Sequence, residues 1–245
     1  MGDTKKRNQS NTKSGVRKGR DLDKWKNNRP KAPEGCIRII GGIHRGMTIL
    51  YSGDRVTRPM KDNVREALFN LVGGYLEDTI CFDLFAGTGA VGLEAISRKA
   101  QLAVLIERHV PTTKIIRQNI ESLGVEDQAK ICGSDTFFWS RQFFTKLQEQ
   151  KSEIESIDYE TLTSTPWSIF CCPPYDLYVS AWDKLKVMIE TFQQTCPPNS
   201  LMVVESDSRF DPALLPKSDK LPESDQWDSR QYSPAVVSVW KKGQS

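Results

Sequence analysis

The sequence predicts an α/β fold in which helices cover both faces of a mostly parallel sheet that ends in an antiparallel hairpin. Short apolar runs alternate with amphipathic segments between about residues 79 and 205, and a glycine-rich turn at 87–92 joins the first run to the segment after it. Composition is the third observation. With 38% hydrophobic and 27% charged residues among 245, the chain has enough apolar side chains for a packed core.

The first 35 residues differ from the rest in charge. Residues 1–35 contain eleven Lys or Arg and four Asp or Glu, a net charge of +7, and because the whole chain carries +3, residues 36–245 carry −4. We expect this basic tail to be disordered because it has few large apolar side chains. It either contacts a phosphate backbone or only keeps the chain soluble. The remainder is expected to be one domain, with a hairpin and helix at 36–74 and the α/β core at 75–245.

The segment after the tail predicts a hairpin followed by a helix. Cys36–Ile40 and Ile43–Tyr51 are apolar runs on either side of Gly41-Gly42, which predicts a β-hairpin with a glycine turn. Asp62 is the expected N-cap of a helix that Gly73-Gly74 ends. The helix is predicted because apolar residues follow at i, i+3, i+4, i+7 and i+8, namely Val64, Ala67, Leu68, Leu71 and Val72.

The core is expected to hold five strands with helices between them. Apolar runs predict the strands at 79–85, 102–107, 129–132, 167–172 and 201–205. The helices are expected to end near Lys99, to run from Pro111 to about Leu123, to start at Asp135, and to span about 179–194. The polar stretch 148–165 is expected to be a surface loop. Residues 227–232 and 236–241 are expected to pair as an antiparallel hairpin across a Ser-Pro turn.

Several classes of protein are disfavoured. No run approaches the roughly 18 apolar residues of a membrane span, and the N-terminus has no apolar signal-peptide core. We therefore expect a soluble cytoplasmic protein without a membrane partner. A metal site is not expected, since the six Cys and two His include no C-x-x-C pair. Most of the cysteines lie in apolar runs, which indicates small hydrophobic side chains in a reducing compartment.

A glycine loop and a later acid predict a ligand site. Gly87, Gly89 and Gly92 match the pattern G-x-G-x-x-G between a strand and a helix. Glycines here let a ligand approach the backbone, and the helix N-terminus offers free N–H groups. Glu107 ends the next strand about 20 residues later, where an acid can bind ribose hydroxyls. The pattern alone is a weak signal, but its place between strand and helix strengthens it.

Asp83, directly before the glycine loop, argues against a nicotinamide cofactor. A carboxylate at this point would repel a pyrophosphate but can bind a cationic ligand. S-adenosylmethionine carries an ammonium and a sulfonium and has no phosphate, so it suits such a site. Asp135, after the third strand, can accept a hydrogen bond from an adenine amino group. It can also be a helix N-cap, and the two roles can coexist.

The turn after the fourth strand predicts a second part of the site. Cys171-Cys172-Pro173-Pro174-Tyr175 follows this strand, and ligands bind at the carboxyl ends of strands in open α/β sheets. The two prolines remove N–H donors and leave carbonyls in a fixed geometry. Tyr175 can stack on an extruded base. A Pro-Pro turn is also an ordinary strand terminator.

Four stretches together resemble one protein family. They are Arg38–Gly46, Thr57–Asn70, Asp83–Glu94 and Cys172–Tyr175. They resemble, in order and with similar spacing, the RsmD family of bacterial small-subunit ribosomal RNA guanine-N2 methyltransferases, of the Rossmann-like class I methyltransferase superfamily. The resemblance covers roughly residues 36–242. It implies a methyl donor, S-adenosylmethionine, and a substrate in small-subunit ribosomal RNA or the assembling small subunit. We expect a monomer.

The resemblance also implies roles for individual residues. It places the donor against Asp83, Phe85, Ala86, Gly87, Thr88, Gly89, Glu107, Arg108, Asp135 and Thr136. It places the reaction at Cys172, Pro173, Pro174 and Tyr175, and RNA against Arg38, His44, Arg45, Arg58, Lys61 and Arg65. The gathering of basic residues in the hairpin and first helix agrees with contacts to a phosphate backbone. A solvated basic helix face is the alternative for any one of them.

The chain departs from the family at Cys172, where the family has Asp. An acceptor at this place holds the hydrogens of the attacking amine, and a thiol is a weak acceptor. Loss of such a charge-assisted bond costs about 1.5–3 kcal/mol. The chain is then a slow enzyme, uses another acceptor such as Asp176, or is a non-catalytic RNA- or ribosome-binding homologue. Two further alternatives are a DNA amino-methyltransferase and a pyrimidine C5-methyltransferase with Cys172 as nucleophile.

Overall fold

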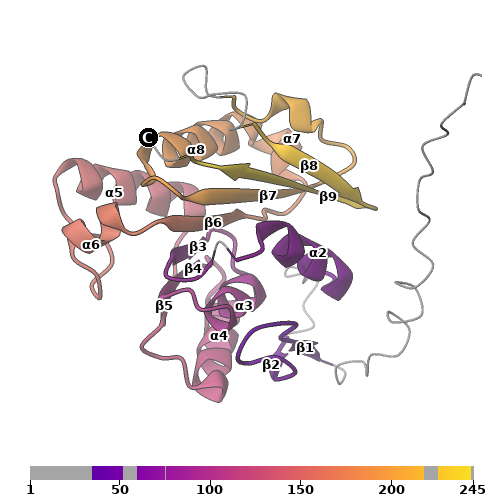
Figure 1. Cartoon of the computed structure of the whole chain (residues 1–245), viewed down its shortest axis with the longest axis vertical. Helices are drawn as coiled ribbons and strands as arrows, with labels where there is room; N and C mark the ends of the chain where they lie inside the picture. The colour runs from indigo at the N-terminus through magenta and orange to yellow at the C-terminus, as the bar shows by residue number, and fades with distance from the viewer. Residues whose placement is uncertain (1–34, 52–59, 75, 218–225, 244–245) are drawn as a thin grey trace, which may run out of the picture. The chain divides into compact units, whose positions relative to one another are not determined.

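The structure, a computed structural model, describes residues 35–51, 60–74, 76–217 and 226–243. A seven-stranded sheet with the order β5-β4-β3-β6-β7-β9-β8 forms its centre (Figure 1). The strands are β3 Ile80–Asp83, β4 Leu102–Ile106, β5 Ala129–Cys132, β6 Trp167–Cys171, β7 Leu201–Asp207, β8 Asp228–Tyr232 and β9 Ala235–Lys241. β3 to β7 run parallel, whereas β9 pairs antiparallel with β7 and with β8. The predicted fold class is therefore confirmed. Except for Gly35, the expected tail at 1–35 lies outside the described residues.

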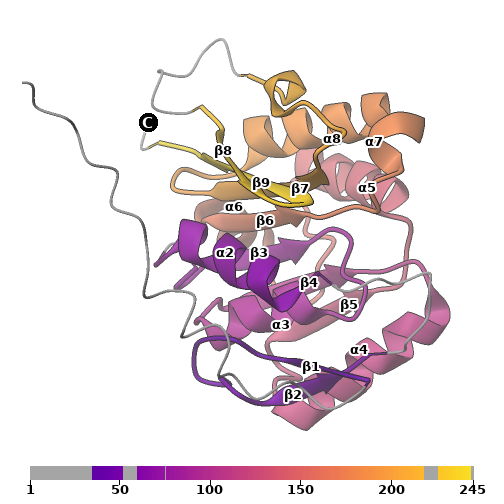
Figure 2. The same ribbon diagram turned by 90° about the vertical axis from the view of Figure 1, so that its right-hand side faces the viewer.

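Helices cover both faces of the sheet, as Figure 2 shows. Alternate strand residues point to opposite faces, so Cys81 packs into one apolar cluster while Ile80 and Phe82 pack into the other. The first cluster contains residues of α2 Asp62–Val72, α3 Ala90–Ser97 and α4 Val110–Leu123; the second contains residues of α5 Thr136–Gln148, α6 Tyr159–Ser164, α7 Leu177–Ser180 and α8 Trp182–Thr195. None of the helices described is long and apolar enough to cross a membrane.

Most predicted helix limits agree with the structure to within three residues, and one cap is displaced. Asp62 is the first helical residue of α2 rather than its N-cap, which is Lys61. The expected stop at Gly73 is present, and this residue has a positive φ of 61°. The last predicted core helix is divided, since α7 precedes α8 and ends at Ser180.

The polar stretch 148–165 is not only a surface loop, and this expectation was wrong. It contains α6 and buries two apolar side chains, those of Ile154 and Leu162. The indole Nε1 of Trp167 donates to the Leu162 carbonyl at 2.8 Å. Because these apolar residues are isolated among polar ones, no helical or strand period revealed them.

The N-terminal hairpin is present, but Gly41 and Gly42 have a structural role other than the predicted turn. β1 Cys36–Arg38 pairs antiparallel with β2 Thr48–Leu50, and residues 39–47 connect them. Gly41-Gly42 is therefore not a tight turn between the strands. A Cβ added at Gly42, which has a positive φ of 75°, would lie 1.7 Å from the Ser97 carbonyl oxygen. The glycines allow the connecting loop to lie directly on the end of α3.

Buried polar side chains of α3 hold this loop. Both Glu94 carboxylate oxygens accept backbone hydrogen bonds, from Ile40 N and Gly41 N at 2.7 Å each. The Ser97 carbonyl accepts from Ile43 N at 2.7 Å. Since buried N–H groups must be bonded, these partners fix the loop on α3.

Asn119 of α4 joins the hairpin to the glycine loop. Its Oδ1 accepts from Leu50 N at 2.6 Å, and its Nδ2 donates to the carbonyl oxygens of Leu50 and Thr88 at 3.1 Å each. The side chain is fully buried. One amide therefore contacts β2 and the loop before α3 together.

We predict that Asn119→Ala lowers the free energy of unfolding by about 1–3 kcal/mol, because the buried Asn119 amide no longer bonds the backbone of Leu50 and Thr88. Gln118→Ala on the exposed side of α4 is the matched control and is expected to change it by less than about 0.5 kcal/mol. Chemical denaturation measures both. Equal stabilities for the two variants would contradict this account of the hairpin.

Candidate functional site

The predicted site lies where the parallel strands end. The order of the strands places β3 between β4 and β6, so their connections leave in opposite directions. In open α/β sheets, ligands bind outside the carboxyl ends of the strands at such a point, here called the crevice. Asp83 ends β3, Glu107 follows β4, and Cys172 follows β6. Asp135 follows β5, and Glu205 lies within β7, two residues before its end. The sheet thus brings residues from 83 to 205 to one edge.

The glycine loop has a backbone geometry that favours glycine. Gly87 and Gly89 have positive φ angles of 54° and 79°, and Gly89 is the N-cap of α3. A Cβ added at Gly89 would lie 3.3 Å from Ile116 Cγ2, and one at Gly92 would lie 2.3 Å from Leu105 Cδ2. The loop therefore turns tightly and packs closely, which presents the N-terminus of α3 at the crevice.

Glu107 supports the glycine loop from the next strand. Its Oε2 accepts from Gly87 N at 2.9 Å, and its Oε1 accepts from His109 N at 2.7 Å. A carboxylate has about four acceptor positions, so capacity remains for the hydroxyls of a ligand. Arg108, the next residue, is exposed.

Asp83 is buried beneath the loop, with only 1% of its surface exposed. Its Oδ2 accepts from Gly92 N in the first turn of α3 at 3.0 Å. Burial raises the pKa of this carboxyl to about 7. The hydrogen bond from Gly92 opposes this increase, and the charge of Glu107 adds to it. Asp83 therefore fixes the start of α3 from below the surface.

The start of α5 forms another wall. Asp135 is its N-cap, since Oδ1 accepts from Phe137 N and Phe138 N at 3.0 and 3.1 Å. Its Oδ2 lies 4.0 Å from Nη1 of Arg108. Thr136 is buried, and its hydroxyl donates to the Leu84 carbonyl. Thr136 thus connects α5 to the glycine loop rather than lying open to a ligand.

Aromatic and small residues complete the wall beside the loop. Phe85 is half-buried and meets Phe137 edge to face, with ring centroids 6.2 Å apart. Ala86 and Thr88 are buried. Their side chains are therefore not exposed to a ligand at the surface.

Cys172 lies between two carboxyl groups. Burial, and then the charges of Glu205 and Asp83, raise the pKa of its thiol well above the usual value. The thiol stays protonated at neutral pH, which disfavours the alternative of a cysteine nucleophile because the thiolate is the reactive form. Of the two prolines that follow, Pro173 is buried and Pro174 is exposed.

Glu205 is the site residue that the sequence interpretation missed. It is 7% exposed, and its Oε1 accepts from the Tyr175 hydroxyl at 2.5 Å. Burial and, to a smaller extent, Asp207 raise the pKa of the Glu205 carboxyl to about 7, while the bond from Tyr175 opposes this. An acid ending the apolar run that begins at Leu201 was the available signal. Asp176, which the sequence suggested as a substitute acceptor, is exposed, and its Oδ1 lies 3.7 Å from Nη2 of Arg209.

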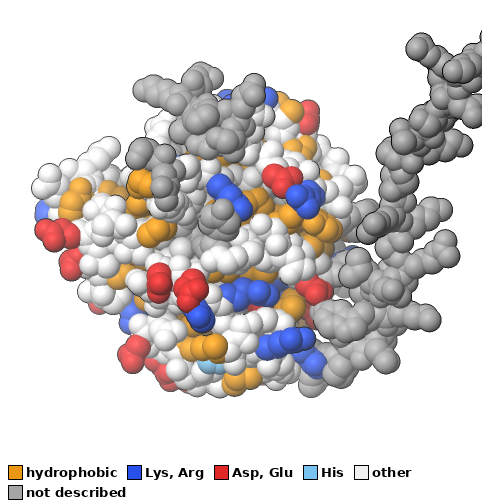
Figure 3. All heavy atoms as spheres, viewed as in Figure 1, with side chains coloured by type: hydrophobic (Ala, Val, Ile, Leu, Met, Phe, Trp, Pro, Cys, Tyr) orange, Lys and Arg blue, Asp and Glu red, His pale blue; other side chains and the backbone are white. Residues whose placement is uncertain are grey.

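The residues expected to contact RNA are not equally available. Arg65 is fully buried, and its guanidinium donates to the Arg38 carbonyl at 2.6 Å and to Asp62 at 3.0 Å. The expectation that Arg65 contacts RNA was therefore wrong, and Arg65 supports the hairpin instead. Arg45 and Lys61 are exposed, whereas Arg38 and His44 are half-buried and Arg58 lies outside the described residues. On the face drawn in Figure 3, described Lys and Arg side chains lie among acidic and apolar ones.

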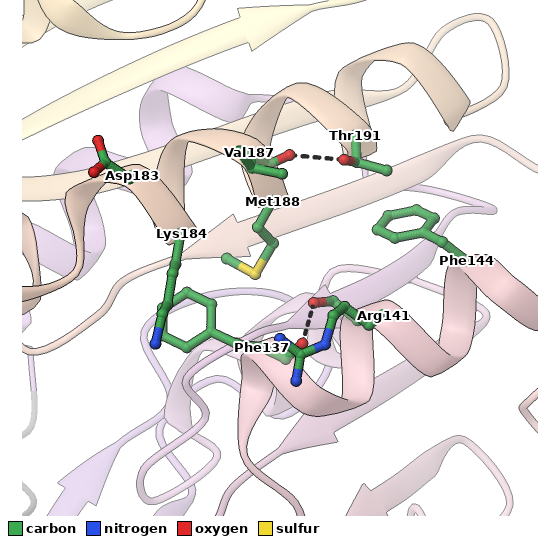
Figure 4. Close-up of a pocket in the computed structure, with 9 residues that line it drawn as sticks. Phe137, Arg141, Phe144, Asp183, Lys184, Val187, Met188 and Thr191 are labelled. Carbon is green, nitrogen blue, oxygen red and sulfur yellow. Dashed lines mark hydrogen bonds between the residues drawn. The ribbon is translucent and has the colours of Figure 1, made fainter.

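A separate groove lies between α5 and α8 (Figure 4). Phe137, Phe144 and Met188 form apolar parts of its lining, and Arg141 and Lys184 add positive charge. Phe137 also contacts Phe85, which lies just before the glycine loop, and all of the lining residues come from α5 and α8. The lining of the groove includes none of Asp83, Glu107, Cys172 and Glu205.

Comparisons with known proteins agree with this fold. The chain matches the "Ribosomal RNA small subunit methyltransferase D" of Escherichia coli K12 with 44% identity over 89 residues, 36% of this chain and 45% of that protein. The protein of the same name from Haemophilus influenzae matches with 31% identity over 110 residues, 44% of this chain and 57% of that protein. The chain thus spans about half the length of these curated relatives.

A solved structure and a family model extend the similarity to most of the chain. The solved structure named "Putative methyltransferase yhhF from Escherichia coli" aligns with a TM-score of 0.63 and 26% identity, covering 86% of this chain and all of that one. The family model described as "Conserved hypothetical protein 95" matches residues 37–238, which include the hairpin, the glycine loop and the Pro-Pro turn. The chain therefore belongs to this family, the RsmD family.

Proposed function

We propose that this protein transfers a methyl group from S-adenosylmethionine to the exocyclic N2 amine of a guanine in small-subunit ribosomal RNA. The observation that carries the proposal is the meeting of the glycine loop, Glu107 and the Cys172–Tyr175 turn at one edge of the sheet. The names of the relatives support a ribosomal RNA substrate. The sequence resemblance supports guanine N2.

The residues of the crevice fit this donor. The Glu107 carboxylate suits two ribose hydroxyls, and Asp135 keeps an oxygen for the adenine amino group while it caps α5. The buried charge of Asp83 favours a cationic ligand and disfavours a phosphate. When bound, S-adenosylmethionine supplies an activated methyl group on a sulfonium. The protein's task is then to orient the acceptor amine and to keep water out.

The second half of the site suits the base. The prolines at 173 and 174 fix backbone carbonyls that can accept hydrogens from the amine, and the Tyr175 ring can stack on the extruded guanine. Arg45 and Lys61 are exposed near the hairpin and the start of α2, where they can hold a phosphate backbone. The basic tail at 1–35 is proposed to add sequence-independent affinity. The proposed setting is the cytoplasm, with a monomer acting on ribosomal RNA or an assembling small subunit.

A second candidate is a homologue that binds RNA without turnover. Cys172 favours it, because a protonated thiol is a weak substitute for the carboxylate of the family motif. The geometry of the glycine loop argues for the enzyme, since RNA binding alone needs neither the positive φ angles nor the carboxylate beneath them. No described segment favours the DNA-methylating alternative.

We predict that the affinity for S-adenosylmethionine rises between about pH 6 and pH 8. In the free protein Asp83 has a pKa of about 7, so below this pH a cationic donor must displace a proton from it. The affinity then falls by up to about tenfold per pH unit below 7 and levels off above it. Asp83→Asn retains an oxygen for Gly92 N and is expected to remove most of the dependence. Calorimetry on both proteins measures it.

S-adenosylhomocysteine is the ligand control, because it lacks the sulfonium charge and should show a smaller rise. An affinity of the wild type that does not change between pH 6 and pH 8 would contradict a charge role for Asp83. No binding at millimolar donor would contradict the donor site itself.

We predict that the protein places labelled methyl groups in N2-methylguanosine when it is given unmodified small subunits or their RNA. Nucleoside mass analysis identifies the product, and Cys172→Asp is assayed beside the wild type. Label only with Cys172→Asp would support the non-catalytic homologue. Label in a different nucleoside, or in none with either protein, would contradict guanine-N2 methylation.

A further inference from the structure

The residue beside Cys172 on the neighbouring strand, β7, is an acid. In the parallel register of β6 and β7, Cys171 pairs with Val204, so Cys172 and Glu205 come next on neighbouring strands. Cys172 packs against the apolar cluster that includes Val203, two residues before Glu205. Because side chains two residues apart share a face, Cys172 and Glu205 lie on the same face at the carboxyl edge.

Asp83 extends this row on the other side. β3 pairs with β6 on the side opposite to β7, and the Asp83 carboxyl turns towards α3 on the same face. The charges of Asp83 and Glu205 both act on the thiol of Cys172. The weak acceptor that replaces the motif acid thus stands between two carboxyl groups.

Of these two carboxyl groups, Glu205 is the one bonded to the turn that is proposed to hold the acceptor base. Asp83 is held by Gly92 N beneath the glycine loop, whereas Glu205 is bonded to the Tyr175 hydroxyl at 2.5 Å. Tyr175 belongs to the turn that follows Cys172. The bond from Tyr175 occupies one acceptor position of the Glu205 carboxylate, which leaves others for a second donor.

We propose that Glu205 is a catalytic residue that accepts a hydrogen of the target amine, in the role left open by Cys172. This inference rests on the proposed methyl transfer. The amine nitrogen forms a bond to the methyl carbon as the carbon–sulfur bond breaks and leaves its electron pair on sulfur. The proton that the nitrogen then loses passes to the Glu205 carboxylate and from there to water. The near-neutral pKa of Glu205 suits a group that takes up and releases a proton.

The test compares Glu205→Gln with the wild type in single-turnover methyl transfer to unmodified small-subunit RNA. Gln has the same shape and can still accept from Tyr175, so the fold is expected to persist. We expect the rate of transfer to fall about 10–100-fold, with the affinities for S-adenosylhomocysteine and RNA within about threefold of the wild type. Glu190→Gln, on α8 away from the crevice, is the matched control and should keep the wild-type rate.

Two further variants separate a chemical role from a structural one. Cys172→Asp in the Glu205→Gln background restores a carboxylate one strand away and is expected to recover most of the lost rate. Tyr175→Phe removes the hydroxyl that Glu205 holds and is expected to cost less than Glu205→Gln. Thermal unfolding of Glu205→Gln at pH 8 should occur at the wild-type temperature or above it, since burial disfavours the ionised acid.

Three results would overturn the inference. One is a wild-type rate for Glu205→Gln while N2-methylguanosine still forms, which would leave the proposed function intact. Another is an equal loss for Tyr175→Phe, which would make Glu205 a support for the tyrosine. The third is a loss of transfer rate in Asp176→Asn but not in Glu205→Gln, which would assign the acceptor role to Asp176. A wild type that methylates no RNA would remove both the inference and the proposed function.

Discussion

The site depends on one constraint: buried and half-buried backbone N–H groups must find acceptors where no regular strand or helix supplies them. In the glycine loop, Glu107 takes Gly87 N, and Asp83 takes Gly92 N. In the hairpin, Glu94 takes the N–H groups of Ile40 and Gly41. In each case a carboxylate from a neighbouring element holds an irregular segment. The acids near the crevice therefore hold the backbone in place, in addition to the chemical roles proposed for them.

The same constraint connects the two halves of the proposed activity. Asn119 holds Leu50 of the hairpin and Thr88 of the glycine loop with one side chain. Arg65 supports the other strand of the hairpin from within the core. The segment proposed to face RNA is thus fixed to the segment proposed to hold the donor. This explains why a short hairpin of two three-residue strands keeps a defined place on the domain.

Much of the fold could be predicted from the sequence because its signals are local. Apolar runs predicted the five parallel strands, and the glycine pattern predicted the turn between β3 and α3. Asp135 as an N-cap was also predictable, since capping depends on adjacent residues. The burial of Arg65 was not, because its partner Arg38 lies 27 positions earlier in the chain. The helix in 148–165 escaped notice because only isolated apolar side chains anchor it.

Glu205 shows why part of a site cannot be predicted from a motif. The departure at Cys172 is visible in the sequence, and it suggested the nearby Asp176 as a substitute. The sheet register instead brings an acid from 33 residues further along the chain to the thiol, and such pairing depends on the fold. When a motif lacks its acid, a substitute is therefore to be sought on the neighbouring strands of the sheet.

The most direct test of the account is the crystal structure of the protein with S-adenosylhomocysteine bound. The account predicts the ribose hydroxyls on the Glu107 carboxylate, the adenine beside Asp135, and the sulfur facing the edge formed by Cys172 and Glu205. Binding in the groove between α5 and α8, or in the crevice with Glu107 making no contact, would contradict it.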